Sequence, residues 1–179
     1  MRVLGLDPST KTGAAVVEAK ESPDGGYEFS LLEKTTFTVP KTVKGFDRLS
    51  QLALKMMDFY EKYKPSSCFI EGYSHNSKFL SFPAVEVAVV LRYFLWQSGA
   101  VVYEVPPKTI KKFTTGNGNA GKDLMLKEVF RRFNHDTDSN DEADAIAAAY
   151  FGLAFEGIPI KLPKKHLEVL DSVQLIALS

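Results

Sequence analysis

The order of the predicted strands and helices constrains the fold of this 179-residue chain more than any other feature. Three strand-like segments, residues 2–6, 13–19 and 27–39, follow one another with only short turns between them. Short turns join antiparallel neighbours, so we expect these segments to form a meander. Residues 67–71 and 101–105 are instead separated by a helical pattern, which is typical of parallel strands. We therefore predict an α/β fold with a five-stranded mixed sheet flanked by helices.

Helical spacing of apolar residues predicts a helix over residues 45–63, and a more apolar helix follows at about 81–97. Shorter helices are expected at about 108–113, 122–133 and 141–155, which complete one domain over residues 1–155. We expect the tail, residues 156–179, to pack on the same domain. The apolar helix contains Pro83, Glu86 and Arg92, so we expect no membrane span. With no secretory signal pattern at the start, the expected location is the cytoplasm of a bacterial-type cell or of a phage host.

Four acidic residues stand where predicted strands end or a predicted helix begins. Asp7 follows the first strand, Glu71 ends the fourth, and Asp141 and Asp144 open the last long helix after Asn140, a good helix cap. If the first and fourth strands are neighbours, Asp7 and Glu71 leave the sheet at the edge where open α/β sheets bind ligands. Taken singly, Asp7 could be only a turn residue and Asp141 only a favourable charge at a helix start. Taken together, the four favour a metal site.

Several carboxylates in one place repel one another unless a cation neutralises them. Mg²⁺ suits such a site, because it prefers oxygen ligands and shares its coordination shell with water and phosphate oxygens. Two such ions about 3.5–4 Å apart can activate a water molecule and stabilise the leaving oxygen in phosphodiester hydrolysis. We therefore expect two Mg²⁺ ions in each active site, with Mn²⁺ able to replace them.

Residues 108–132 form a basic segment with a glycine-rich middle. Its seven Lys and Arg residues are opposed by two acidic residues, so the segment carries a formal charge of +5. Loops rich in backbone N–H groups and flanked by lysines suit contact with nucleic-acid phosphates. A solvated helix face with a flexible connection would show the same charge. The residues of this segment that we predict to contact DNA are Lys108, Lys111, Lys112, Gly116, Gly118 and Lys122.

The whole chain has 22 basic and 22 acidic residues and a formal net charge of zero. This balance excludes a protein that binds nucleic acid through overall basicity, but it allows a local basic face. Since residues 108–132 carry +5, the rest of the chain carries −5. We therefore expect an acidic metal centre beside a basic DNA-contact segment.

In this order, the segments resemble the RuvC family of Holliday-junction resolvases, members of the ribonuclease H-like superfamily. The likeness covers about the first 155 residues. Residues 3–10 (VLGLDPST) look like the family's opening strand with its first catalytic aspartate, and residues 69–71 (FIE) like its fourth strand with the glutamate. Residues 106–122 resemble its lysine-bearing, glycine-containing DNA-contact segment. Residues 141–147 (DEADAIA) resemble its last motif, in which two aspartates open an alanine-rich helix.

The resemblance implies a Mg²⁺-dependent endonuclease that nicks two opposed strands of a four-way junction in DNA recombination and repair. It assigns the metal ions to Asp7, Glu71, Asp141 and Asp144, and it makes Lys122 a further catalytic candidate, with Lys111, for stabilising transition-state charge. The resemblance also implies a homodimer. Separately, the helix predicted within residues 79–96 has apolar residues on nearly all of its faces. One face can cover the sheet, and the others favour contact with a second copy of the chain.

The sequence departs from the family three positions after the glutamate, where an aromatic residue often wedges at the junction centre. Ser74 stands there, with Tyr73 beside it and Phe79 further on. Tyr73 is therefore our aromatic candidate for DNA contact, and a divergent or phage-type resolvase that accepts several branched DNAs fits this departure. Two alternatives stay open, a ribonuclease H-like hydrolase of RNA–DNA hybrids and a non-catalytic branched-DNA-binding module.

Overall fold

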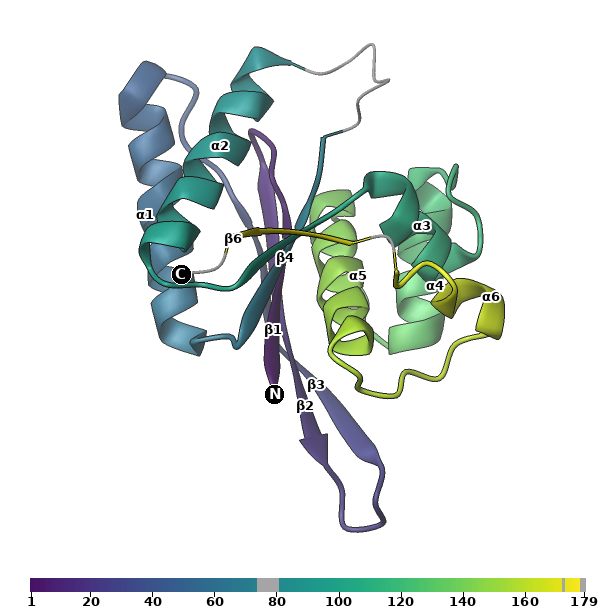
Figure 1. Ribbon diagram of the computed structural model, residues 1–179. Helices are drawn as coiled ribbons and strands as arrows, with labels where there is room; N and C mark the ends of the chain where they lie inside the picture. Colours follow the sequence, from purple (N-terminus) through teal and green to yellow (C-terminus); the bar gives the residue numbers. More distant parts are fainter. Residues whose placement is uncertain (74–80, 172, 178–179) are drawn as a thin grey trace.

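The computed structural model describes residues 1–73, 81–171 and 173–177, and within them a sheet lies between two layers of helices (Figure 1). Ser74 and Phe79, considered above for the junction centre, lie outside the described residues. The elements in chain order are β1 (Arg2–Asp7), β2 (Thr12–Glu21), β3 (Tyr27–Phe37), α1 (Gly45–Tyr63), β4 (Ser67–Glu71), α2 (Phe82–Gln97), β5 (Val102–Val105), α3 (Pro107–Thr115), α4 (Lys122–Phe133), α5 (Asn140–Phe155), α6 (Lys164–Leu167) and β6 (Gln174–Ala177).

The strands of the described sheet follow the order β3-β2-β1-β4-β5-β6. β1, β2 and β3 form the predicted antiparallel meander, while β4 pairs parallel with both β1 and β5. All five predicted strands and their mixed arrangement are thus confirmed. A sixth strand that the sequence did not predict, β6, pairs antiparallel with the outer edge of β5. The pairing of β6 covers backbone groups that an edge strand would otherwise expose.

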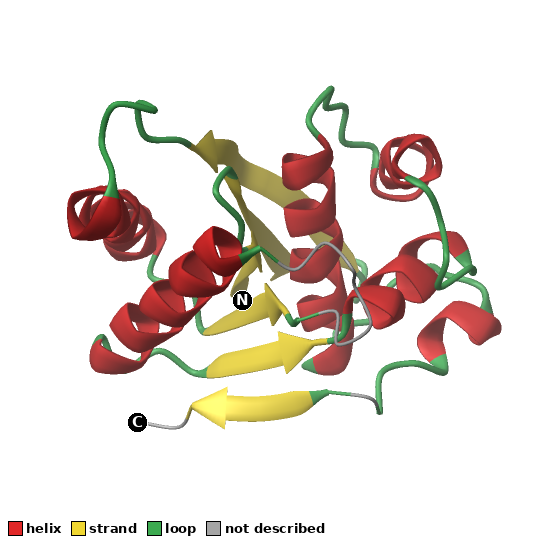
Figure 2. Cartoon of the chain, turned by 90° about the horizontal axis from the view of Figure 1, so that it is seen from above, coloured by secondary structure: helices red, strands yellow, loops and turns green. Residues whose placement is uncertain are grey.

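Helices cover both faces of the sheet, so its central strands are apolar on both sides. α1 and α2 lie on one face, and α3, α4 and α5 lie on the other, as the view from above shows (Figure 2). Along β1, Val3 faces the second layer and Leu4 faces the first, and both are fully buried. Alternate side chains of a strand point to opposite faces, so a strand covered on both faces reads as a continuous apolar run.

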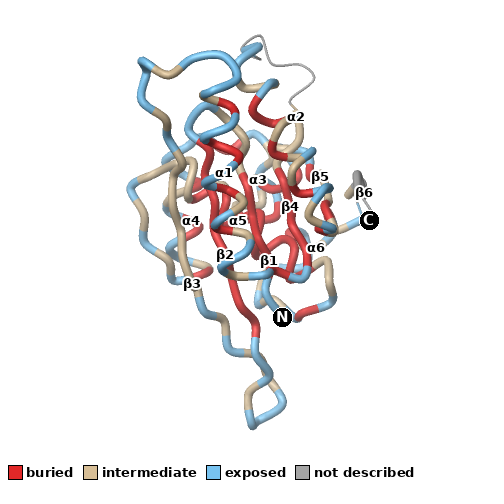
Figure 3. The backbone as a smooth tube through the Cα atoms, turned by 90° about the vertical axis from the view of Figure 1, so that its left-hand side faces the viewer, coloured by how far each residue is buried: buried red, intermediate tan, exposed pale blue. Residues whose placement is uncertain are grey.

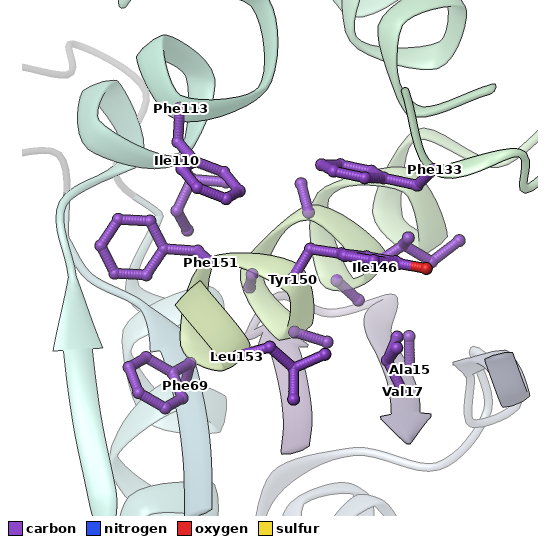
Figure 4. Close-up of a cluster of buried hydrophobic side chains, with 14 of the residues drawn as sticks. Ala15, Val17, Phe69, Ile110, Phe113, Phe133, Ile146, Tyr150, Phe151 and Leu153 are labelled. Carbon is purple, nitrogen blue, oxygen red and sulfur yellow. The ribbon is translucent and has the colours of Figure 1, made fainter. Parts of the chain in front are cut away.

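Helix α5 is the most deeply buried helix of the fold, and aromatic side chains surround its outer face. Figure 3 shows it buried with the central strands, whereas the tip of the β2–β3 hairpin is exposed. Tyr150 of α5 stacks on Phe133 of α4 at 4.0 Å between ring centroids, and Phe151 meets Phe113 of α3 at 5.2 Å. These contacts hold α3 and α4 outside α5 (Figure 4). None of the described helices is long and apolar enough to cross a membrane.

Two glycines let α5 approach the sheet more closely than any side chain would allow. A Cβ atom added at Gly5 of β1 would lie 2.0 Å from the carbonyl oxygen of Ala145. A Cβ atom added at Gly13 of β2 would lie 1.9 Å from the carbonyl oxygen of Asp141. Both contacts are with backbone atoms, which cannot move aside as a flexible side chain does. The backbone of α5 therefore rests directly on the first two strands.

We predict that Gly5→Ala destabilises the protein by about 3 kcal/mol or more, because the added methyl group has to push α5 away from β1. The measurement is urea unfolding followed by circular dichroism. Gly121→Ala is the matched control, since a Cβ atom at Gly121 meets nothing within 4 Å. Equal stability of the two variants would contradict this account of helix packing.

Candidate active site

The parallel pairing of β1 and β4 places the first two predicted carboxylates side by side. Leu6 is in register with Ile70, so the next residues along the strands, Asp7 and Glu71, leave the sheet at the same edge. Both belong to the wall of a hollow of about 150 Å³ at that edge. The remaining wall residues are mostly small or cyclic, namely Pro8, Gly72, Tyr73, Ala84, Ala88 and Pro107.

The start of α5 brings the other two predicted carboxylates to this edge. Asp141 packs through its backbone on Gly13, one residue after β2 begins. Asp144 is one turn further along α5 and raises the pKa values of both Asp7 and Glu71 by charge repulsion. The helix is capped by Ser139, whose hydroxyl accepts a hydrogen bond from the backbone N–H of Glu142. The prediction that Asn140 is the cap is therefore wrong, because Ser139, one residue earlier, fills that role.

The four carboxylates share an environment that disfavours their charge. Burial, reinforced by the charges of Asp144 and Asp141, raises the pKa of Asp7 to about 7. Burial and the neighbouring charges of Asp7 and Asp144 raise the pKa of Glu71 well above its usual range. Burial likewise raises the pKa of Asp144 to about 6 and, to a smaller extent, the pKa of Asp141. Buried carboxylates that repel one another create a site for positive charge.

Lysines from two helices oppose this negative charge. Lys111 of α3 acts on Asp7, Glu71 and Asp144, and its charge lowers the pKa of all three. Lys122, the first residue of α4, does the same for Asp7, Asp141 and Asp144. The structure therefore brings both predicted lysines to the carboxylates.

Lys11, in the turn between β1 and β2, was missed by the sequence reasoning. Its charge lowers the pKa of Asp141, although burial outweighs it and the pKa is raised overall. Lys11 lies only four residues after Asp7, in the turn that follows the strand. This short spacing could have indicated that Lys11 lies near the carboxylates.

The carboxylates fit a divalent cation by their chemistry. Among the described residues, the side chains of Asp7, Glu71 and Asp144 form no hydrogen bond or ion pair. The side-chain oxygen of Asn140, the residue before Asp141, is buried with no partner in the described part of the chain. Carboxylate and amide oxygens are the donors that Mg²⁺ and Mn²⁺ accept. However, no three acidic, histidine or cysteine side chains of the described residues are arranged as a coordination shell.

The basic segment forms two helices and the loop between them. Lys108 and Lys112 are exposed on α3, and Lys111 on the same helix is partly buried. Gly116 ends α3 with a φ of 78°, a left-handed conformation that glycine adopts without strain. Gly118 lies over the start of α3, where an added Cβ atom would be 3.1 Å from the carbonyl oxygen of Lys108. The loop thus turns back over α3, and Lys122 at its end lies near the carboxylates. The DNA contacts of the lysines and glycines in this segment stay predictions.

Tyr73, the predicted aromatic contact, is held against α2 by Arg92. The guanidinium group lies 4.6 Å from the centroid of the Tyr73 ring, and its Nη1 donates a hydrogen bond of 3.2 Å to the Tyr73 hydroxyl. Arg92 also pairs with Glu104 of β5 at 2.8 Å and donates to the carbonyl oxygen of Glu71 at 3.4 Å. One arginine therefore fixes both the aromatic ring and the end of β4 that carries the glutamate.

Comparisons with known proteins agree with this arrangement. The family model described as "Crossover junction endodeoxyribonuclease RuvC" matches residues 3–151. A protein of that name from Brachyspira hyodysenteriae is 34% identical over 152 residues, which cover 83% of this chain and 91% of the relative.

Solved structures show the same fold. The Thermus thermophilus RuvC structure superposes with a TM-score of 0.72 at 20% identity, covering 90% of this chain and 100% of the other. A second Thermus thermophilus RuvC structure, in complex with a Holliday junction substrate, gives a TM-score of 0.68 at 19% identity, covering 83% and 90%. By the extent of the family match and the identity to its relatives, this chain belongs to the RuvC family of crossover junction endodeoxyribonucleases.

Proposed function

We propose that this chain is a Mg²⁺-dependent endonuclease that resolves four-way DNA junctions by paired nicks in recombination and repair. The observation that carries the proposal is the meeting of buried carboxylates from β1, β4 and α5 with Lys111 and Lys122 at one sheet edge. A protein that only bound DNA would gain nothing from buried negative charge next to phosphates. The substrate is supported by a relative of the same fold, Thermus thermophilus RuvC, whose structure includes a Holliday junction.

Different residues of the chain have different roles in the proposed reaction. Asp7, Glu71, Asp141 and Asp144 would hold two Mg²⁺ ions, which when bound supply the charge that activates water and stabilises the leaving oxygen. Lys122 and Lys111, whose charges act on Asp7, would balance negative charge that develops on the phosphate during attack. Arg92 keeps the end of β4 in place through its bond to the Glu71 carbonyl oxygen. Lys108, Lys112, Gly116, Gly118 and Tyr73 would bind and orient the DNA.

The proposal includes a homodimer formed through α2. Four large apolar side chains of this helix are exposed and follow one another at helical spacing: Phe82 (87%), Val89 (53%), Tyr93 (50%) and Trp96 (50%). Several large apolar side chains exposed along one helix, here called the apolar strip, are typical of an interface. A second copy supplies the second active site that paired cuts require.

Replacing either strand-end carboxylate tests the catalytic site. We expect Asp7→Asn and Glu71→Gln each to slow cleavage of a synthetic four-way junction in Mg²⁺ by roughly 10²–10³-fold, since each removes charge that the cations need. Gel assays of product formation measure this. Asp58→Asn and Glu61→Gln, exposed on α1, are the matched controls and should cleave normally.

The same assay separates the proposed activity from the alternatives. Full activity in both site variants would exclude the carboxylate mechanism. Preference for an RNA–DNA hybrid over the junction would indicate a hybrid hydrolase. Tight junction binding without cleavage in Mg²⁺ or Mn²⁺ would indicate a binding module.

Without divalent metal, burying the charged carboxylates should lower the folding stability of the protein. The pKa of Asp7 is 3.8 in its unperturbed form and about 7 in the fold, so the fold favours the protonated carboxyl. In EDTA and below about pH 4, this carboxyl is protonated in both the folded and the unfolded protein, so it does not change folding stability. As the pH rises from about 4 to 7, the unfolded chain loses the proton first, and the free energy of unfolding falls. We expect Asp7→Asn to be more stable than the wild type by about 4 kcal/mol at pH 8 and equal to it near pH 4, since each unit by which the pKa is raised corresponds to about 1.4 kcal/mol. Urea unfolding at both pH values measures the difference, and equal stability at pH 8 would contradict it.

Breaking the apolar strip tests the dimer. We expect the double substitution Tyr93→Glu/Trp96→Glu to shift the protein from dimer to monomer, because it places charge in a desolvated interface. Sedimentation velocity measures the mass, and circular dichroism checks that α2 is still folded. Leu54→Glu, at an exposed apolar position on α1, is the control and should remain dimeric. A wild-type protein that is monomeric at high concentration would refute the interface.

A further inference from the structure

The C-terminal segment beyond the family match at residue 151 is folded onto the helical layer of α3 and α5. Ile158, His166 and Val169 are buried, and Leu162 and Leu170 are partly buried against the same core. The short helix α6 (Lys164–Leu167) lies within this segment and packs beside α3. The described part of the segment is therefore fixed to the domain and can present side chains in defined places.

His166 anchors α6 to the end of α3. Its side chain is 1% exposed, and its Nδ1 lies 2.7 Å from the carbonyl oxygen of Phe113, which accepts a hydrogen bond from it. Burial lowers the pKa of His166, and the charges of Arg132 and Lys165 lower it further, although the bond to Phe113 and the charge of Glu128 oppose them. The imidazole is therefore a neutral internal contact, and its surroundings are already rich in positive charge.

The anchor places two lysines beside the glycine-rich loop. The position that a Cβ atom would take on Gly116 is 2.9 Å from Nε2 of His166 and 3.2 Å from Cε of Lys165. The stem of Lys165 therefore lies against the turn that ends α3, and Lys164 precedes it on α6. Both side chains are exposed, and neither forms an ion pair within residues 1–73, 81–171 and 173–177.

The glycine-rich loop lies between α6 and the lysines of the predicted DNA-contact segment. Lys108 and Lys112 on α3 are likewise exposed and unpaired in the described residues. Gly118 rests on the backbone of Lys108, while Gly116 touches Lys165, so one loop connects the two pairs of lysines. Nearby Arg131 and Arg132 are instead paired with Glu128 of their own helix. The exposed ammonium groups of α3 and α6 around this loop are complementary to a polyanion.

We propose that Lys164 and Lys165, the α6 lysines, extend the DNA-binding surface and contact phosphates of a duplex arm beyond the catalytic site. This inference rests on the proposed function, because the DNA must already be bound at the carboxylates. Ammonium groups on flexible stems contact phosphates without reading bases, so the α6 lysines add affinity and not sequence preference. The C-terminal segment thus gives this chain a longer footprint on DNA than residues 3–151 provide.

The test is the salt dependence of junction binding in EDTA. Lysine–phosphate contacts release counterions, and each contact contributes about 0.9 to the slope of log K against log salt. We expect Lys164→Gln/Lys165→Gln to lower this slope by about 1–2 and to weaken binding about tenfold at low salt. The double variant Lys164→Arg/Lys165→Arg, which keeps the charge, should bind like the wild type. Lys20→Gln/Lys64→Gln, near the starts of β1 and β4 and so away from the ends that carry Asp7 and Glu71, is the control for loss of two charges.

The outcomes distinguish this inference from the function on which it rests. If the wild type cleaves the junction in Mg²⁺ and the Gln variant keeps the wild-type slope and affinity, the α6 lysines do not contact DNA. An equal loss in the Lys20/Lys64 control would also overturn the inference, because the effect would then be one of net charge. If the wild type neither binds nor cleaves any branched DNA, the proposed function fails first and this inference falls with it.

Discussion

The contact between α5 and β1 at Gly5 determines how the rest of the site is assembled. Because Gly5 has no side chain, the helix backbone lies directly on the strand, with the Ala145 carbonyl 2.0 Å from where a Cβ atom would stand. This contact sets the height of α5 above the sheet, and Asp144 is the residue before Ala145. A helix held off by even one methyl group would carry Asp144 away from Asp7. The glycines of β1 and β2 are therefore a requirement of the chemistry as well as of packing.

The same close approach has an electrostatic cost. It removes water from carboxylates that repel one another, and Lys111 and Lys122 offset only part of the penalty, since the pKa values of Asp7 and Asp144 stay raised. The two apolar layers around the sheet offset this cost, with Phe133 packed on Tyr150 of α5 and Phe113 packed on Phe151 of the same helix. A site that is unfavourable without bound cations is well suited to hold them.

Most of the fold and the four carboxylates could be predicted from the sequence, because both depend on local patterns. Apolar runs that end in Asp7 and Glu71 predict strand ends, and the helical crossover between parallel strands follows from chain order. The Ser139 cap could not be separated from Asn140, since both residue types are good caps. The position of α6 was not predictable either, because it depends on His166 bonding to the backbone of Phe113, 53 residues away in the chain.

Helix α2 connects the active site to the proposed dimer interface. Arg92 holds Tyr73 and the Glu71 carbonyl, and the next residue, Tyr93, belongs to the exposed apolar strip. A movement of α2 would therefore shift the interface and the end of β4 together. The guanidinium group contacts the Tyr73 ring and hydroxyl at once, so the ring is fixed as a wall of the hollow beside Asp7. Tyr73, which follows β4, is thus part of the rigid framework, and its position depends on the same helix that would form the proposed dimer.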